Sequence, residues 1–426
     1  MVQSAVFWIL LISSATAFWM LPKRMRYGFV AVVSLVYLFI LAPLSIVPML
    51  GLALISFWLA PYAVVNRRKK ENSAEMLLIP LHDESGVVAP THLFAPRVAK
   101  LILFFLITVN LLYLILFKYI APLVPASARV ASSLQQGSVT VKVIVPLGIS
   151  YFTFKLIHYL IEVSRGNITD RSLARFLGYV FVFPAFPAGP IERFDHFLSH
   201  LQDRPMIAEG VRRIIHGLIK KFVFADLCLG GYFRDANAKS LLLSLGHTQT
   251  VDVWKLLIAS YLYIYMDFSG YTDLALGACQ LFGIRLMENF NFPILAVNIA
   301  AFWKRWHITL ANWCQSYVFM PMLGWTRNVY VAIYATFVSI GLWHAASLNW
   351  FFWGVYHATG IIIYQQWSQW KRRRNWKFSD HSFSRPAAIA LTFLFVSVGM
   401  IFTLDSIATS HDLLRVAAKL VWIRIS

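Results

Sequence analysis

The chain has 426 residues, of which 59% are hydrophobic and 13% are charged. Ordinary soluble domains contain about 25% charged residues, so this composition excludes a soluble globular protein. The formal net charge of +19 would suit a nucleic-acid-binding protein, but the lysines and arginines stand in short clusters beside apolar runs, which is the pattern of membrane topology signals. We therefore expect an all-α, polytopic membrane protein that lies in the lipid bilayer and binds no nucleic acid.

The N-terminal part of the chain contains apolar runs that are expected to cross the membrane, since a helical span takes about 20 residues. These runs are Ala5–Leu21, Tyr27–Leu41, Ser45–Val64 and Leu101–Ile120. The first run is expected to be a retained span, because its basic cluster follows it and no signal-peptide cleavage site stands out. The lysine and arginine bias places Asn66–Arg97 in the cytoplasm and Ala126–Ser138 outside.

The middle of the chain is less regular. Val143–Ile161 is expected to span the membrane, whereas Pro184, Pro187 and Pro190 interrupt or follow the apolar run Phe176–Phe186. Irregular backbone at membrane depth survives only inside protein or along a cavity, so this run predicts a re-entrant or broken helix. The later apolar segments are Ile214–Leu229, Trp254–Phe282, Ile299–Leu323, Val329–Leu342, Trp350–Trp367, Ala387–Phe402 and the short amphipathic Leu413–Ile425. In all, the sequence predicts roughly ten or eleven spans.

Two histidines stand out because each lies in an apolar, tryptophan-rich segment. His307 ends the stretch Phe302–His307, and His344 ends Gly341–His344. A polar group at bilayer depth is costly and usually functional, and histidine ionises near neutral pH, so either side chain could take a proton from a hydroxyl. The alternative for each is a packing histidine bonded to a backbone carbonyl. We expect His357 to be a packing or interfacial residue.

Further charged and amide side chains lie in apolar surroundings. We expect Asp267 and Asp273 to be structural, bonded to neighbouring helices or histidines, and Glu288–Pro293 to break the chain before the first of the two histidines. Its amide side chains are expected to fix the helix entry or to line the site. Nearer the N-terminus, Glu192 and Arg193 form a candidate ion pair.

The three cysteines, Cys228, Cys279 and Cys314, stand singly, without the spacing of a zinc site or a disulfide framework. They are expected to be small packing residues. We therefore expect no metal site and no permanently bound cofactor.

Several of these segments belong to an ordered set of motifs. The set is Pro146–Ser150, Ala188–Ile191, Gly217–Lys221, Asp267–Tyr271, Glu288–Phe290, Phe302–His307 and Gly341–His344. It resembles the bacterial branch of the membrane-bound O-acyltransferase (MBOAT) superfamily, of the alginate O-acetylase and teichoic-acid D-alanyl transferase type. The resemblance implies a ring of tilted helices with re-entrant segments around a central tunnel. We expect one integral-membrane domain over 1–426, with peripheral spans in 1–140, a catalytic core in 141–370 and C-terminal spans in 371–426.

The resemblance also implies the chemistry. An acyl thioester donor, acetyl-CoA or the phosphopantetheine of an acyl carrier protein, would enter from the cytoplasm. An extracytoplasmic glycan, or a periplasmic or secreted acyltransferase partner, would accept the acyl group. His344 is implied as the general base, and His307 would orient the acceptor or stabilise the oxyanion, with the order of the two roles open. The candidates for the substrate site and donor tunnel are Trp303, Lys304, Arg305, Trp306, Trp343, Asn289, Asn291, Asp267 and Tyr271.

Lys304 and Arg305 directly precede His307 on one expected helix. Successive helical residues point about 100° apart, so we expect only one of the two cations to line the path of a phosphate-bearing donor. The other is expected to pair with Asp267 or Glu288, or to reach the lipid headgroups.

The chain departs from the family pattern in two places near the expected donor entrance. Trp313–Tyr317 lacks an arginine and an aspartate that many relatives carry, and the loop Gly324–Asn328 is short. The donor therefore stays open between acetyl, which we expect, and D-alanyl transferred from a carrier protein to a teichoic-acid-like acceptor. In either case we expect a multi-pass protein of the bacterial cytoplasmic (inner) membrane.

Two other classes of protein are compatible with the sequence. A proton-coupled transporter or flippase could use Asp267, Asp273 and Glu162 with the histidines as a proton relay. Against it, the chain shows no duplicated halves, which many transporters have. An inactive scaffold is the other class, because of the lost arginine and aspartate.

Overall fold

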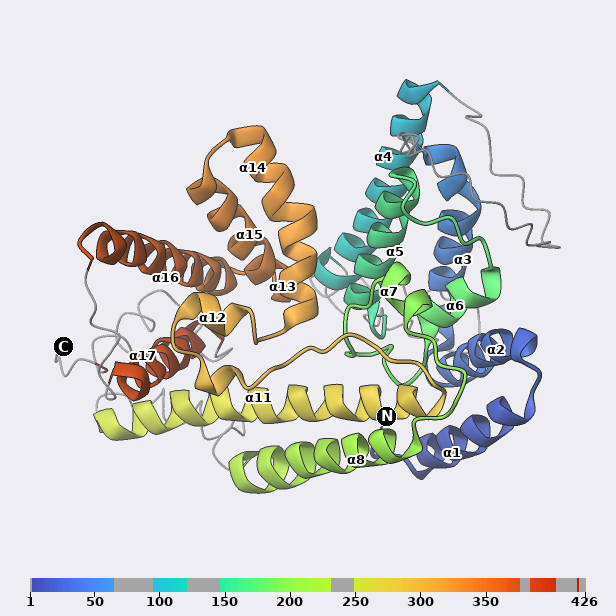
Figure 1. Ribbon diagram of the computed structural model, residues 1–426, viewed down its shortest axis with the longest axis horizontal. Helices are drawn as coiled ribbons and strands as arrows, with labels where there is room; N and C mark the ends of the chain where they lie inside the picture. Colours follow the sequence, from blue (N-terminus) through green and yellow to red (C-terminus); the bar gives the residue numbers. More distant parts are fainter. Residues whose placement is uncertain are drawn as a thin grey trace, which may run out of the picture. The chain divides into compact units, whose positions relative to one another are not determined.

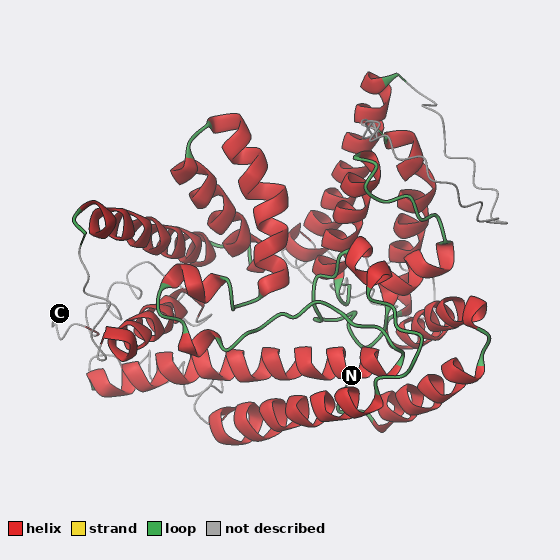
Figure 2. Ribbon diagram, in the orientation of Figure 1, coloured by secondary structure: helices red, strands yellow, loops and turns green. Residues whose placement is uncertain are grey.

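The computed structural model describes residues 2–64, 95–120, 146–230, 249–375, 384–403 and 420. Helices form the regular structure of these parts, which confirms the expected all-α fold (Figure 2). The expected cytoplasmic loop Asn66–Arg97, except for its last three residues, lies outside the described residues. So do the stretch Ala126–Ser138 and, except for Leu420, the segment Leu413–Ile425.

The contacts of the chain form two compact units, residues 1–187 with 192–203 and residues 188–191 with 204–426. The expectation of one membrane domain over the whole chain stays a prediction.

The first unit contains α1 to α7, and its early helices match the expected spans closely. The bounds are α1 Ala5–Met20, α2 Lys23–Leu41, α3 Pro43–Leu59, α4 Pro96–Ile115, α5 Ile149–Ser164, α6 Leu173–Phe181 and α7 Phe194–Ser199, with short continuations η1 Ala60–Ala63 and η2 Leu116–Ile120. Pro43 begins α3, because a proline lacks the N–H that the first helical turn leaves unbonded. Gly148, at φ 68°, precedes α5 and sets its start later than expected.

The break predicted after Phe176 is confirmed. α6 ends at Phe181, and the buried Lys155 of α5 donates to the carbonyls of Tyr179 and Val180, 3.2 and 3.4 Å away. A lysine that bonds the last carbonyls of a helix stabilises its end. The chain then continues through the proline-rich turn without regular helix.

The second unit contains the remaining helices. They are α8 Ile207–Leu218 with its continuation η4 Ile219–Leu229, α11 Thr250–Leu281, α12 Ile299–Trp303, α13 Ile308–Cys314, α14 Met320–Thr326, α15 Val329–His344, α16 Leu348–Arg373 and α17 Ser384–Gly399. Short pieces η5 Pro293–Leu295, η6 Gln315–Phe319 and η8 Met400–Thr403 complete it. Figure 1 shows α8 running beside α11.

By length and composition, four stretches of the described residues can cross a membrane. They are Lys23–Leu41, Pro43–Ala63, Pro96–Ile120 and Ser384–Thr403, and Ala5–Met20 and Val329–His344 are shorter apolar helices. The other predicted spans are present as helices that are broken, more polar or preceded by turns. The total number of spans stays a prediction.

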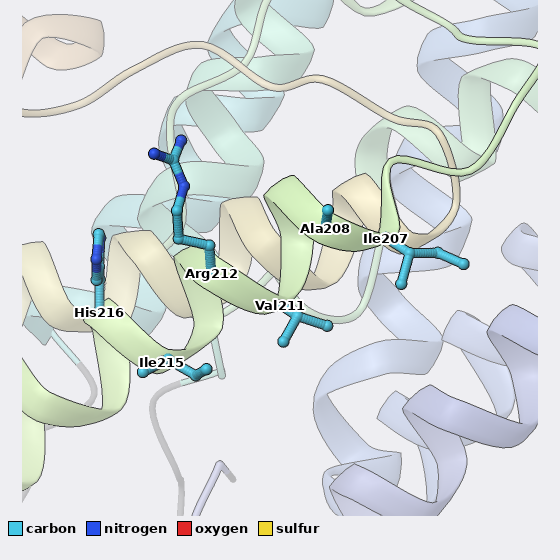
Figure 3. Close-up of a pocket in the computed structure, with 6 residues that line it drawn as sticks. All are labelled: Ile207, Ala208, Val211, Arg212, Ile215 and His216. Carbon is cyan, nitrogen blue, oxygen red and sulfur yellow. The ribbon is translucent and has the colours of Figure 1, made fainter.

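Glycines allow α8 and α11 to approach closely. A Cβ on Gly210 would lie 2.8 Å from the carbonyl oxygen of Gly277, and one on Gly277 would lie 2.6 Å from that of Gly210. The opposite face of α8 carries Ile207, Val211 and Ile215, which line a surface pocket of about 420 Å³ with Arg212 and His216 beside them (Figure 3). The spacing of four residues puts these apolar side chains on one face of the helix.

A glycine also allows α15 and α16 to approach closely, so adding one methyl group there should lower the stability strongly. A Cβ on Gly341 would lie 2.1 Å from the carbonyl oxygen of Trp350. We expect Gly341→Ala to lower the free energy of unfolding by about 1–3 kcal/mol or more, because backbone must move. Thermal unfolding of the purified protein in detergent measures the change.

Gly324→Ala is the matched control, since nothing lies within 4 Å of a Cβ at that helical position. Alanine favours a helix over glycine by about 1 kcal/mol, so this variant should melt at the same temperature or higher. If both variants lost stability equally, close packing at Gly341 would not be the cause.

Candidate active site

An irregular segment between α11 and α13 brings His307 beside Asn289. Two backbone hydrogen bonds hold the segment: the amide of Asn291 donates to the carbonyl of Arg305, and the amide of Ile308 donates to the carbonyl of Asn289, each over 2.9 Å. His307 itself has φ 43°. Left-handed backbone is uncommon outside glycine and is concentrated at functional sites.

This geometry corrects the expected span Ile299–Leu323. The stretch is not one helix, because α12 ends at Trp303 and α13 begins at Ile308. A left-handed residue cannot continue a right-handed helix, so the chain turns at His307. Lys304 and Arg305 therefore lie in a turn, and the argument that one helix separates their directions does not apply.

His307 is buried, with 3% of its surface exposed, and is held by a polar network. Its Nδ1 lies 2.9 Å from Oδ1 of Asn289, and the same oxygen accepts from the hydroxyl of Thr309 at 2.9 Å. The Thr309 hydroxyl in turn accepts from the amide of Ile191 at 3.0 Å. The ring of Phe268 meets the imidazole edge-on, with centroids 4.8 Å apart.

His344 is the last residue of α15 and is exposed. Its ring stacks on that of Trp350, with centroids 4.5 Å apart and planes 17° apart. The indole of Trp343 contacts both histidines, at 6.3 Å from the His307 ring and 4.6 Å from the His344 ring. The two predicted catalytic histidines thus meet at one tryptophan.

Two further predicted aromatic residues, Trp306 and Trp303, pack against other aromatic rings. Trp306 stacks on Phe302 with centroids 5.6 Å apart. Trp303 is buried and contacts the rings of Phe337 at 4.9 Å and His357 at 5.3 Å. His357 is itself buried, with 2% exposed, which agrees with the expected packing role.

The carboxylates near the site have cationic partners other than those expected. Asp267 pairs with Lys221, and Glu288 pairs with Arg213. The alternative in which Lys304 or Arg305 pairs with Asp267 or Glu288 is therefore wrong, because residues of α8 and η4 already neutralise both acids. The other alternative, in which one of the two cations reaches the lipid headgroups, stays a prediction.

Asp273 is buried in α11, and its two oxygens each lie 2.7 Å from a cation, Nε of Arg213 and Nζ of Lys220. These ion pairs suit the structural role that we expect of Asp267 and Asp273.

Two further predicted site residues, Asn291 and Tyr271, are not buried as His307 is. Asn291 is exposed, and Tyr271 lies half-buried on α11. The candidate ion pair of Glu192 and Arg193 is also corrected: Glu192 is buried just before α7, and its carboxylate lies 2.5 Å from Nδ1 of His196 in that helix. This hydrogen bond raises the pKa of His196 above its usual value.

Thr309 and the Ile191 amide are the residues of the site that sequence reasoning missed. Ile191 ends the Ala188–Ile191 motif, and Thr309 lies two residues after the Phe302–His307 motif. Nothing in the sequence indicates that these two residues are in contact. Among the described residues, no group of three or more histidine, cysteine, aspartate or glutamate side chains could hold a metal ion.

Comparison with known proteins agrees with these motifs. The chain is 34% identical over 267 residues to a probable alginate O-acetylase of Pseudomonas putida, which covers 61% of this chain and 52% of that protein. It is 29% identical over 271 residues to the teichoic acid D-alanyltransferase of Bacillus subtilis, with 59% and 67% covered. It is 30% identical over 302 residues to the peptidoglycan O-acetyltransferase of Helicobacter pylori, with 62% and 54% covered. The chain spans about half the length of the alginate relatives that it matches.

The family model described as MBOAT, membrane-bound O-acyltransferase family, matches residues 97–404. This range contains His307, His344 and Asn289, and it is most of the chain. The chain therefore belongs to the membrane-bound O-acyltransferase family.

Proposed function

We propose that this protein transfers an acetyl group from a cytoplasmic acyl thioester to a hydroxyl of an extracytoplasmic cell-envelope glycan, or to a relay protein that serves it. The observation that carries the proposal is the pair of histidines that meet at Trp343, in a chain of the membrane-bound O-acyltransferase family. The names of the Pseudomonas and Helicobacter relatives support acetyl as the acyl group and a polymer as the acceptor.

The reaction needs a general base and a hydrogen-bond donor that stabilises the negative charge of the oxyanion. The hydroxyl oxygen bonds to the thioester carbonyl carbon, the carbon–sulfur bond breaks, and the hydroxyl proton passes through an imidazole to the sulfur that leaves. An alcohol is a weak nucleophile until a neutral imidazole shares its proton. A hydrogen-bond donor must also stabilise the oxyanion. His344 and His307 are proposed to divide these roles.

D-alanyl transfer from a carrier-protein thioester is the second candidate reaction. The Bacillus relative, named a teichoic acid D-alanyltransferase, is covered over 67% of its own length, which favours this alternative. In both cases the protein would lie in the bacterial cytoplasmic (inner) membrane and bind its donor from the cytoplasm.

A thioester assay tests the proposal. Purified protein in lipid is incubated with acetyl-CoA, or with a D-alanyl carrier protein, and the thiol that is released is measured with and without a polysaccharide acceptor. We expect acceptor-dependent thiol release with one donor and none with the His344→Ala variant. No release with either donor would contradict acyl transfer, and release that is equal in the variant would contradict the role of His344.

The proposed topology makes a separate prediction. With the three native cysteines replaced, a single cysteine at Arg373 should resist a membrane-impermeant maleimide in intact cells, because short basic loops stay in the cytoplasm. A single cysteine at Ser132 should be labelled. Labelling of Arg373→Cys in intact cells would reverse the orientation and place the donor on the other face.

Lys304 and Arg305 give a prediction about the donor. Lys304 is exposed and Arg305 is half-buried, and no carboxylate of the described residues lies within ion-pair distance of either. We expect Lys304→Gln to raise the Michaelis constant for a phosphate-bearing donor several-fold and Arg305→Gln to raise it less, because the exposed cation can meet the donor. A donor lacking the phosphates should remove the difference, whereas equal small effects would indicate membrane anchoring.

A further inference from the structure

The hydrogen bonds around Asn289 determine which atom of its amide group faces His307. The Thr309 hydroxyl accepts from the amide of Ile191 over 3.0 Å and donates its own hydrogen to the Asn289 side chain over 2.9 Å. The backbone amide of Thr309 also points to the same atom, over 3.4 Å. Two donors therefore meet it, and only the carbonyl oxygen of Asn289 can accept from both.

The same oxygen lies 2.9 Å from Nδ1 of His307. Since a carbonyl oxygen can only accept, Nδ1 must carry a hydrogen. A neutral imidazole that is protonated at Nδ1 has its lone pair at Nε2. The protein thus fixes one tautomer of His307 through a chain of three hydrogen bonds that begins at a backbone amide.

The nitrogen of the Asn289 amide group has a different environment from its oxygen. Asn289 is fully buried, and its Nδ2 makes no hydrogen bond to the described residues. A buried polar atom without a partner is destabilising and rare in native proteins. An asparagine at this position supplies the acceptor that lies beside Nδ1 of His307.

We propose that Asn289 is the positioning residue that holds His307 in the Nδ1–H tautomer, so that Nε2 accepts the hydrogen of the acceptor hydroxyl. This inference rests on the proposed acyl transfer and decides a role that the sequence left open. A neutral His307 of this tautomer has no N–H at Nε2 to offer an oxyanion. It therefore orients the acceptor by accepting a hydrogen bond from its hydroxyl. The hydroxyl proton passes through His344 to the leaving sulfur as the new carbon–oxygen bond forms and the carbon–sulfur bond breaks. The arrangement has the logic of a catalytic histidine oriented by a third group.

Asn289→Asp is the decisive variant, because it keeps the acceptor and adds a negative charge. The charge stabilises the imidazolium, so more of the enzyme is protonated and inactive at low pH. We expect the acidic limb of the pH profile of kcat to move up by about one pH unit or more. Asn375→Asp is the matched control: it adds the same charge at an exposed position just after α16, outside the proposed site, and should leave the profile in place.

Asn289→Leu removes the acceptor and should lower kcat by about 100-fold or more, with little change in the Michaelis constant for the donor. If this variant does not fold, Thr309→Val, which removes the hydroxyl link, should lower kcat while Thr309→Ser retains it. An unmoved pH profile in Asn289→Asp, together with normal kcat in Thr309→Val, would overturn the inference.

A spectroscopic readout separates the inference from the proposed function. In protein labelled with ¹⁵N-histidine, solid-state NMR should show a protonated Nδ1 signal that is lost in His307→Gln. If the wild-type protein released no thiol from either donor but showed this signal, acyl transfer would fail and the tautomer would stand. If it released thiol and the signal came from Nε2, the inference would fail alone.

Discussion

Alanine at either His307 or His344 is expected to abolish acyl transfer while the protein still inserts in the membrane and purifies normally. Removal of a general base typically lowers the rate 10²- to 10⁴-fold, and the same range is expected for a group that acts at the reacting atoms. Both imidazole rings contact the indole of Trp343, so both are placed to act on the same bound thioester and acceptor. Turnover of thioester by purified variants, at saturating donor, measures the effect.

His216 supplies the control for these variants. It lies on α8 beside the surface pocket, far from Trp343 in the sequence (Figure 3). His216→Ala should therefore keep wild-type turnover. If His344→Ala kept most of its turnover while it folded normally, the assignment of that histidine would be wrong.

Asp273→Ala is expected to lower the stability of the protein measurably. The carboxylate is 8% exposed and neutralises Arg213 and Lys220 together. In Asp273→Ala, Lys220 loses its carboxylate, whereas Arg213 keeps Glu288. The two cations are 28% and 33% exposed, so the loss should lie between the value of a solvated pair, about 1 kcal/mol, and that of a buried pair, about 3 kcal/mol. A folded protein has only about 5–15 kcal/mol of stability, so the variant should melt at a lower temperature in detergent.

Asp267→Ala is the comparison within the same helix. Asp267 also has one cationic partner, Lys221, but its side chain is 34% exposed. A solvated pair contributes about 0–1 kcal/mol, so the loss should be much smaller. Equal melting temperatures for the two variants would show that the ion pairs of Asp273 are not a stabilising centre.

The sequence predicted those parts of the fold that depend on local pattern. The apolar runs gave α1 to α4 and α17 with nearly correct bounds, and the prolines after Phe181 correctly marked a break. The continuous apolar pattern around His307 predicted one helix where the chain turns, because a single left-handed residue leaves no mark in hydrophobic periodicity.

Charge partners were harder to predict, because they depend on which helices pack together. Lys220 and Lys221 form one of the short basic clusters beside apolar runs, yet they pair with Asp273 and Asp267 across the contact of η4 with α11. The sequence paired Glu192 with its neighbour Arg193, whereas the chain enters α7 just after Glu192, so its carboxylate meets His196 in that helix.

The candidate histidines themselves followed from chemistry and motif, but their surroundings did not. Asn289 was expected near the site, and the structure adds the atom that it presents and the hydroxyl of Thr309 that fixes it. Contacts of this kind join segments of the chain that sequence spacing does not relate.

The left-handed backbone at His307 limits which amino acids the position can accommodate. A β-branched side chain at φ 43° would be strained, whereas asparagine is among the few residues that enter this region readily. Asparagine in place of His307 would therefore keep the turn, retain an N–H donor and be unable to act as a base. His307→Asn would distinguish loss of backbone shape from loss of proton transfer, a separation that alanine at this position does not provide.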